Sequence, residues 1–219
     1  MLKKIPFYSN TPDDTHCFQA SLRMILKYFL PEREFTWKQL EKMTAKKPDL
    51  WTWQLAGILW MQENGFDVRN REVFDYHRFI HEGDEYLLRE FGKEVGSAQI
   101  KNSDIKQERS LSKKFVQSVA IEKEVPAIAD MQRLFQEGFL MIININSSVL
   151  NKKPGYTGHS VVLTGFSEST ITFHDPGLPP MPNRSVPTAL FETAWGYPNE
   201  NAKTLVAFRP KKKYTMKRS

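Results

Sequence analysis

The sequence predicts an α+β protein, with helices in its N-terminal half and strands afterwards. Helical spacing of apolar residues and helix-capping signals dominate the chain as far as residue 137, whereas short apolar runs separated by turn signals follow. The length of 219 residues and a hydrophobic fraction of 40% suit one folded domain, because domains hold about 100–200 residues. We therefore expect a single domain over 1–208.

The first helix is expected to begin near Cys17 and to end at Phe29, ahead of the helix breaker Pro31. One of the three polar residues at 13–15 is predicted to cap its start. Only one narrow stripe of this helix is polar. Because a helix that is apolar around most of its circumference is buried, we place it inside the domain.

Two further helices are predicted from their caps. Thr36 and Gln39 form a capping-box pattern that predicts a helix over 37–46, and Thr52 is predicted to cap a helix over 53–64. The other expected elements are a strand over 66–74, a charged helical stretch over 75–124 broken at Gly83, Gly92 and Gly96, helices over 127–137 and 188–195, and strands over 139–145, 160–166, 170–173 and 204–208. The stretch 75–125 has the weakest pattern, and we interpret it as a helical insertion or a lid.

The net charge of +6 is concentrated at the C-terminus. Residues 209–219 hold six basic and no acidic residues, so the rest of the chain is formally neutral. A basic tail can contact nucleic acid or anionic lipid. We interpret this one as a solvated, flexible end, because nucleic-acid-binding domains usually carry their charge on the folded surface.

Composition also indicates the compartment. Cys17 is the only cysteine, so no internal disulfide can form. No apolar run approaches the roughly 18 residues of a transmembrane helix, and no apolar segment of the secretory kind follows the first lysines. We therefore expect a cytoplasmic protein without a transmembrane segment.

Cys17 is the first candidate for chemistry. It stands at the first turn of the buried helix, where free N–H groups and the positive end of the helix dipole stabilise a thiolate. A lowered cysteine pKa makes a nucleophile. On position alone, however, a cysteine packed in the core as a small apolar residue is the simpler interpretation.

His159 and Asp175 favour the interpretation of Cys17 as a nucleophile over that of a packed core residue. His159 opens an apolar strand directly after Gly158, and Asp175 ends the next strand, so a hairpin would bring the two side chains together. A nucleophilic thiol needs a base within hydrogen-bond reach, and the base needs an orienting group. Asp-Pro-Gly is also a plain turn signal. The ordered set of three is more specific than any one of its members.

These motifs resemble those of papain-fold cysteine peptidases of the bacteriocin-processing, double-glycine leader peptidase type and their stand-alone relatives. The resemblance rests on residues 5–10, 17–28, 158–166 and 174–177. It implies that Cys17 is the nucleophile, His159 the general base and Asp175 its orienting group. It also implies a papain-like fold, in which a helical N-terminal half packs on an antiparallel β-sheet half and the active site lies in the cleft between them.

The sequence departs from the family pattern at two places. The family usually has a Gln about six residues before the cysteine, whose amide helps to build the oxyanion hole. Here Thr11 stands six residues before it and Asn10 seven. We expect Asn10 to supply the amide, with Thr11 as the alternative and the Cys17 backbone N–H as second donor. The family also usually has Gly after the cysteine, where this chain has Phe18.

Other polar residues are weaker candidates. Asn144 and Asn146 end a buried strand, and we expect Asn146 and Gly158 to line the substrate cleft. The loop 147–157 is interpreted as a lid or, equally, as a surface crossover. The pair His77 and His81 lacks a third ligand and does not match the zincin order, so no metal is expected. The sequence contains no phosphate loop or dinucleotide fingerprint, and no cofactor is expected.

The leading hypothesis is a metal-independent thiol hydrolase, specifically a cysteine peptidase that acts on a peptide or protein substrate through an acyl-enzyme. An acyltransferase or a deamidase would use the same three residues, and the sequence does not separate them. The alternative from another class is a non-catalytic module of the same fold that binds a peptide in the cleft. Phe18 and the missing Gln motivate that alternative.

Overall fold

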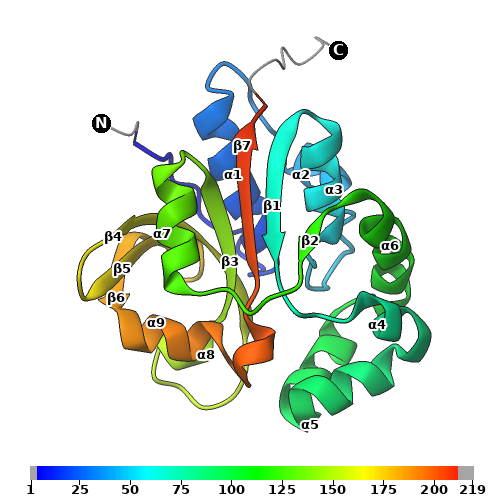
Figure 1. Cartoon of the computed structure of the whole chain (residues 1–219). Helices are drawn as coiled ribbons and strands as arrows, with labels where there is room; N and C mark the ends of the chain where they lie inside the picture. The colour runs from blue at the N-terminus through cyan, green and yellow to red at the C-terminus, as the bar shows by residue number, and fades with distance from the viewer. Residues whose placement is uncertain (1–3, 212–219) are drawn as a thin grey trace.

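The computed structural model describes residues 4–211, and within them a seven-stranded sheet has the strand order β2-β1-β7-β3-β4-β5-β6 (Figure 1). The strands are β1 (Phe66–Arg71), β2 (Ile121–Glu122), β3 (Leu140–Asn146), β4 (Gly158–Phe166), β5 (Thr170–Asp175), β6 (Met181–Pro187) and β7 (Leu205–Pro210). The helices are α1 (Cys17–Phe29), α2 (Trp37–Met43), α3 (Leu55–Glu63), α4 (Tyr76–Glu82), α5 (Asp84–Asn102), α6 (Ile105–Ser118), α7 (Ile128–Gln136), α8 (Ser147–Leu150), α9 (Thr188–Trp195) and the 3₁₀ helix η1 (Glu200–Ala202).

The α+β class is confirmed, with one correction to the sheet. β2 pairs with β1 in parallel, whereas the other strand pairs of the described chain are antiparallel, so the sheet is mixed. The prediction missed β2 because a strand of two residues leaves no periodic pattern. It also missed β6, an edge strand whose residues are mostly polar or proline.

Alternation along the central strands creates two cores. On β3, Ile142 packs with α1, α2 and α3, whereas its neighbours Met141 and Ile143 face α7 and α9. Figure 1 shows α1 behind the sheet and α7 in front of it. Because successive side chains of a strand point to opposite faces, one continuous apolar run such as β3 serves both cores.

The helix α1 is buried and has the predicted bounds. The expected cap is wrong: His16 is the N-cap residue, and no side chain caps the helix from that position. The Asp13 carboxylate instead accepts from Thr11 and Thr15, and the Asp14 carboxylate accepts from the Asn10 amide. Asp13 and Asp14, which were predicted as possible caps of α1, therefore form hydrogen bonds within the loop before the helix.

The predicted cap is confirmed for α2 and wrong for α3. Thr36 and Gln39 form the predicted capping box at the start of α2. Thr52 does not cap α3, which begins after Gln54. The Thr52 hydroxyl accepts a hydrogen bond from Gln19 Nε2 at 3.0 Å. Thr52 therefore bonds a side chain of α1 instead of a backbone N–H group of α3.

The stretch 75–125 is mostly helical, as predicted, and forms α4, α5 and α6, followed by the short strand β2. Gly83 separates α4 from α5, and Gly92, with φ of 73°, kinks α5. Gly96 is not a break, because it lies inside α5 packed against the Leu87 and Leu88 backbone. In Figure 1 these helices lie beyond the β2 edge of the sheet.

The C-terminal strand runs further than expected, to Pro210. Most of the predicted basic tail, from residue 212 onward, lies outside the described residues. Among residues 4–211, no helix is long and apolar enough to cross a membrane.

Candidate active site

Three elements bring Cys17, His159 and Asp175 together. Cys17 is the first residue of α1, His159 lies at the start of β4, and Asp175 ends β5. α1 packs along β4, where Ser21 Oγ donates to the Ser160 carbonyl at 3.2 Å. The packing of a buried helix on a buried strand therefore brings the thiol to the imidazole.

His159 is bonded on both sides. Its Nε2 lies 2.8 Å from Asp175 Oδ1, which leaves Nδ1 for the Cys17 thiol. Burial disfavours the thiolate, but the hydrogen bond and charge of His159 outweigh it and lower the pKa of Cys17. Burial also disfavours the imidazolium, but the bonds to Asp175 and Cys17 raise the pKa of His159 to about 10. The two groups therefore favour a thiolate–imidazolium pair at neutral pH.

Asp175 is held as a buried carboxylate. Burial alone would raise its pKa, yet its bonds to His159, the Gly177 N–H and Arg184 together lower that pKa. Arg184 Nη1 donates to Oδ2 at 2.8 Å, and the Gly177 N–H donates to Oδ1 at 3.0 Å. A charged, fully bonded carboxylate can fix the imidazole in one orientation.

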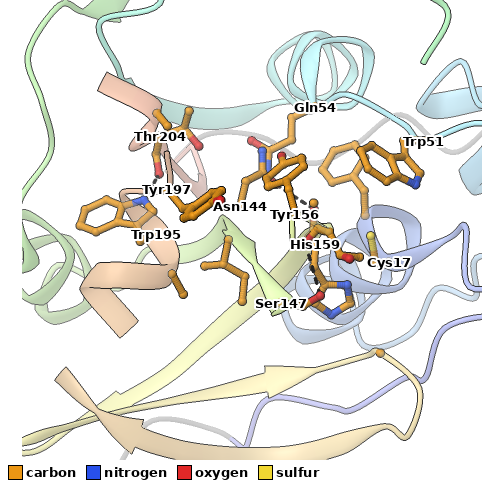
Figure 2. Close-up of a pocket in the computed structure, with 18 of the residues that line it drawn as sticks. Cys17, Trp51, Gln54, Asn144, Ser147, Tyr156, His159, Trp195, Tyr197 and Thr204 are labelled. Carbon is orange, nitrogen blue, oxygen red and sulfur yellow. Dashed lines mark hydrogen bonds between the residues drawn. The ribbon is translucent and has the colours of Figure 1, made fainter. Parts of the chain in front are cut away.

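A cleft of about 650 Å³ opens beside the thiol, and Gly158 lines it, as expected. Figure 2 shows the cleft running from Cys17 and His159 at one end to Trp195 and Tyr197 at the other. Aromatic side chains form much of its wall, from Trp51, Trp53, Phe74, Phe91, Tyr156, Trp195 and Tyr197. A cleft of this volume with a mostly apolar wall is typical of a ligand-binding site.

One wall of the cleft comes from α5, within the stretch that the sequence left open between insertion and lid. Gln99 Nε2 donates to the Tyr156 hydroxyl at 2.9 Å, and Asn199 Nδ2 donates to the Glu90 carbonyl at 3.0 Å. The 147–157 segment begins with α8 and also lines the cleft. Both segments therefore lie against the cavity and are bonded across it.

Asn10 lies in the loop before α1, and its amide is engaged there. Its Oδ1 accepts the N–H groups of Thr11 at 2.9 Å and His16 at 2.8 Å. Its Nδ2 donates to Asp14 Oδ1 at 2.8 Å. Neither Asn10 nor Thr11 is among the described residues that line the cleft.

Asn146 also acts within its own loop. Its Nδ2 donates to the Gly155 carbonyl at 3.0 Å, and its Oδ1 accepts from the Ser148 and Thr157 N–H groups. Of the two asparagines at the end of β3, Asn144 is the one that lines the cleft. Residues two apart on a strand share a face, so alternation does not separate the two asparagines. Asn146 is instead held by its hydrogen bonds to the loop after β3, and the expectation that it lines the cleft is wrong.

The other histidines lie apart from the thiol. His16 pairs with Glu41 at 3.0 Å, and His174 bonds a backbone carbonyl of the N-terminal segment. His77 and His81 are exposed on α4. No group of three His, Cys, Asp or Glu side chains within residues 4–211 is placed to hold a metal ion.

Comparison with known proteins agrees with the motifs around Cys17, His159 and Asp175. Residues 2–202 match the Peptidase_C39 like family. The chain belongs to this family. The crystal structure of a candidate C39-like peptidase from Bacillus anthracis is 20% identical over 95% of this chain and 96% of that one, with a TM-score of 0.46. No curated protein matches the sequence. The family match confirms the resemblance that the motifs predict, and the family is one of peptidase type.

Sequence reasoning missed three residues of this candidate site. Arg184 bonds the Asp175 carboxylate, Gly177 donates its N–H to the same group, and Asp14 lines the cleft beside Cys17. Gly177 had a local signal, since it completes the Asp-Pro-Gly turn. Arg184 had none, because it lies on the strand that the sequence did not predict.

Proposed function

We propose that the protein is a cysteine peptidase in which Cys17 is the nucleophile, His159 the general base and acid, and Asp175 the orienting group. One observation carries the proposal: His159 bonds Asp175 at 2.8 Å and at the same time lowers the pKa of the Cys17 thiol. A thiol–imidazole catalytic pair requires this relation. Membership of a peptidase-type family supports the peptide bond as substrate.

The proposed reaction begins from the thiolate. Cys17 Sγ attacks the carbonyl carbon of the substrate, and the carbonyl π electrons move to oxygen. As the intermediate collapses, the C–N bond breaks and the His159 imidazolium gives its proton to the leaving amine. Water, deprotonated by His159, then attacks the thioester carbonyl, the C–S bond breaks, and the acid product leaves.

The oxyanion needs hydrogen-bond donors at the start of α1. The first N–H groups of a helix have no acceptor within it, and here the first bond to the His16 carbonyl comes from Ala20. We assign the Cys17 backbone N–H to the oxyanion. The Asn10 amide is bonded within its loop, so we assign Asn10 to positioning that loop.

Phe18 does not argue for an inactive relative. Its side chain is buried, and its ring lies where a Cβ on Gly57 would stand, 2.6 Å from Phe18 Cζ. The absence of a side chain at 57 thus accommodates the large residue that follows the nucleophile. The core beneath the cleft therefore accommodates Phe18, although the family usually has Gly at this position. The helix α1 still begins at Cys17.

The test is alkylation of Cys17 by iodoacetamide as a function of pH. The wild-type chain is expected to react well below the pKa of about 8.5 of a free cysteine. His159→Ala is expected to lose this reactivity at low pH. His81→Ala, at an exposed histidine of α4, is the matched control and is expected to react like the wild type.

A peptide mixture analysed by mass spectrometry then separates the reactions. Products with a new carboxyl group indicate a peptidase, whereas products that form only with an added amine indicate an acyltransferase. A thiol that titrates like free cysteine in all three proteins, with peptide still bound, would favour the non-catalytic module and overturn the proposal.

A further inference from the structure

The cleft continues from the thiol across the face of the sheet. The strand register places Asn70, Val206, Ile142 and Val162 in one row over β1, β7, β3 and β4. Two residues along, the same face carries Glu72 on the chain after β1 and Ser160 on β4, and both line the cleft. Neighbouring strands lie about 4.8 Å apart, so this row spans about 14 Å.

Glu72 lies at the far end of that row. The register of β1 with β7, continued by one residue, sets Glu72 opposite Thr204, which also lines the cleft. Figure 2 shows Thr204 beside Tyr197 and Trp195, at the end opposite to Cys17. The far end of the cleft therefore has an acidic and a hydroxyl side chain on neighbouring strands.

The Glu72 carboxyl is buried without a cation. It is 5% exposed, and its Oε1 accepts from Asn70 Nδ2 at 2.6 Å and from the Tyr76 hydroxyl at 2.9 Å. Within residues 4–211, no basic side chain pairs with Glu72, and its hydrogen bonds from Asn70 and Tyr76 both reach Oε1 rather than Oε2. Thr204 Oγ1, enclosed nearby, has no partner either.

In the described part of the chain, no positive charge is paired with the Glu72 carboxylate. Burial raises the pKa of Glu72, although the two neutral donors oppose that shift. A buried carboxylate is costly unless an opposite charge completes it. Asp175, another acid that lines the cleft, has Arg184 and His159 as its cations, whereas Glu72 pairs with no cation within residues 4–211.

The surroundings suit a long cationic side chain. Phe74, Tyr76 and Phe91 line the same cleft. The aliphatic stem of Lys or Arg packs on such surfaces while its charged end reaches a polar group, and the rings themselves attract the cation.

We propose that Asn70, Glu72 and Thr204 form a subsite for a Lys or Arg side chain of the substrate. The subsite rests on the proposed peptidase function, because it is placed relative to the bond that Cys17 would attack. An extended peptide advances about 3.4 Å per residue, so the basic residue lies about four residues from the scissile bond. The subsite would select basic segments at a distance from the reacting atoms.

The experiment measures binding in the Cys17→Ala chain, where no turnover occurs. The probes are fluorescently labelled octapeptides of Ala and Ser, blocked at both ends, with one Lys at each position in turn. Matching peptides carry norleucine, which lacks the amine. Fluorescence anisotropy is expected to give a Kd about tenfold lower for Lys than for norleucine at one position, because hydrogen bonds to charged groups are stronger than those between neutral groups.

Three variants in the same chain locate the effect. Glu72→Gln keeps an acceptor for Asn70 and Tyr76 and is expected to abolish the preference for Lys. Glu108→Gln is the control, because Glu108 is another buried acid, with its pKa raised by burial to about 8, and does not line the cleft. Thr204→Val is expected to weaken the preference for Lys in part. It provides the test of the subsite if Glu72→Gln does not fold.

Equal binding of Lys and norleucine peptides at every position, or no binding of either, would overturn the subsite. So would an equal loss in the Glu72 and Glu108 variants. A preference for Lys together with an ordinary, unreactive Cys17 would keep the subsite and overturn the peptidase. A reactive Cys17 without any preference for Lys would do the reverse.

Discussion

Arg184 Nη1 donates to Asp175 Oδ2 at 2.8 Å, while His159 Nε2 bonds Oδ1 of the same carboxylate at 2.8 Å. Arg184 Nη2 also donates to the Leu150 carbonyl at 3.0 Å and to Asn151 Oδ1 at 2.9 Å. One guanidinium thus links the orienting acid of the proposed catalytic site to the last residue of α8 and the residue after it, both of which line the cleft.

Replacing this guanidinium is expected to reduce activity. Arg184→Gln removes one of the groups that lower the pKa of Asp175, so the carboxylate protonates at higher pH and releases His159. We expect kcat/KM to fall about 10–100-fold, the equivalent of one hydrogen bond to a charged group. The acidic limb of the pH profile moves upward. Arg184→Lys restores part of the rate if charge matters, and an unmoved pH profile in the Gln variant would contradict this role.

Gly177 is packed too closely for any side chain. A Cβ there would stand 2.9 Å from Asp175 Oδ1 and 3.2 Å from His159 Nε2. We expect Gly177→Ala to displace the imidazole and to slow Cys17 alkylation at pH 7. Gly165→Ala is the control, because its Cβ would approach nothing closer than 4.0 Å. Equal labelling rates in the two variants would show that the contact is relieved elsewhere.

The thiolate–imidazolium pair predicts a bell-shaped pH dependence. The rate rises as the thiol ionises, below the value of about 8.5 of a free cysteine, because His159 lowers the pKa of Cys17. It falls again as the imidazolium loses its proton, near the raised pKa of about 10 for His159. Measured kcat/KM against pH checks both limbs. An alkaline limb near 6.5, the ordinary value for histidine, would contradict the pairing.

Asp14 opposes thiolate formation from the rim of the cleft. Its negative charge raises the pKa of Cys17, against the stronger effect of His159. Asp14→Asn keeps the acceptor for Asn10, and Asn tolerates the positive φ of 56° at this position. We expect alkylation of Cys17 to begin at lower pH in this variant. Asp13→Asn is the control in the same loop, and a similar shift there would assign the effect to the loop rather than to Asp14.

Asn10 distinguishes positioning from oxyanion binding. As a loop residue, Asn10→Ala loses the acceptor for the His16 N–H, and we expect about 1 kcal/mol lower unfolding free energy together with slower Cys17 alkylation. As an oxyanion donor, it would instead lower kcat by about 10²–10³ with alkylation and stability unchanged. Urea unfolding and alkylation kinetics on one preparation decide between the two.

The sequence was most informative where the signal is local. The bounds of α1 follow from its apolar surface and from Pro31, and the α2 cap follows from two residues three apart. Cys17, His159 and Asp175 were candidates because each stands at the end of a recognisable element. Such features are encoded by neighbours in the chain, so a periodic pattern or a turn is enough to find them.

Long-range packing decided the rest. Thr52 bonds a side chain of α1 instead of capping α3, and the Asn10 amide closes a loop. Arg184 reaches Asp175 only because β6 adds to the sheet edge beside β5, and Glu72 faces Thr204 only through the register of β1 with β7. A residue's own segment shows whether it is polar. Which distant group it meets, and whether it is left buried without a partner, depends on contacts across the whole chain that no local pattern contains.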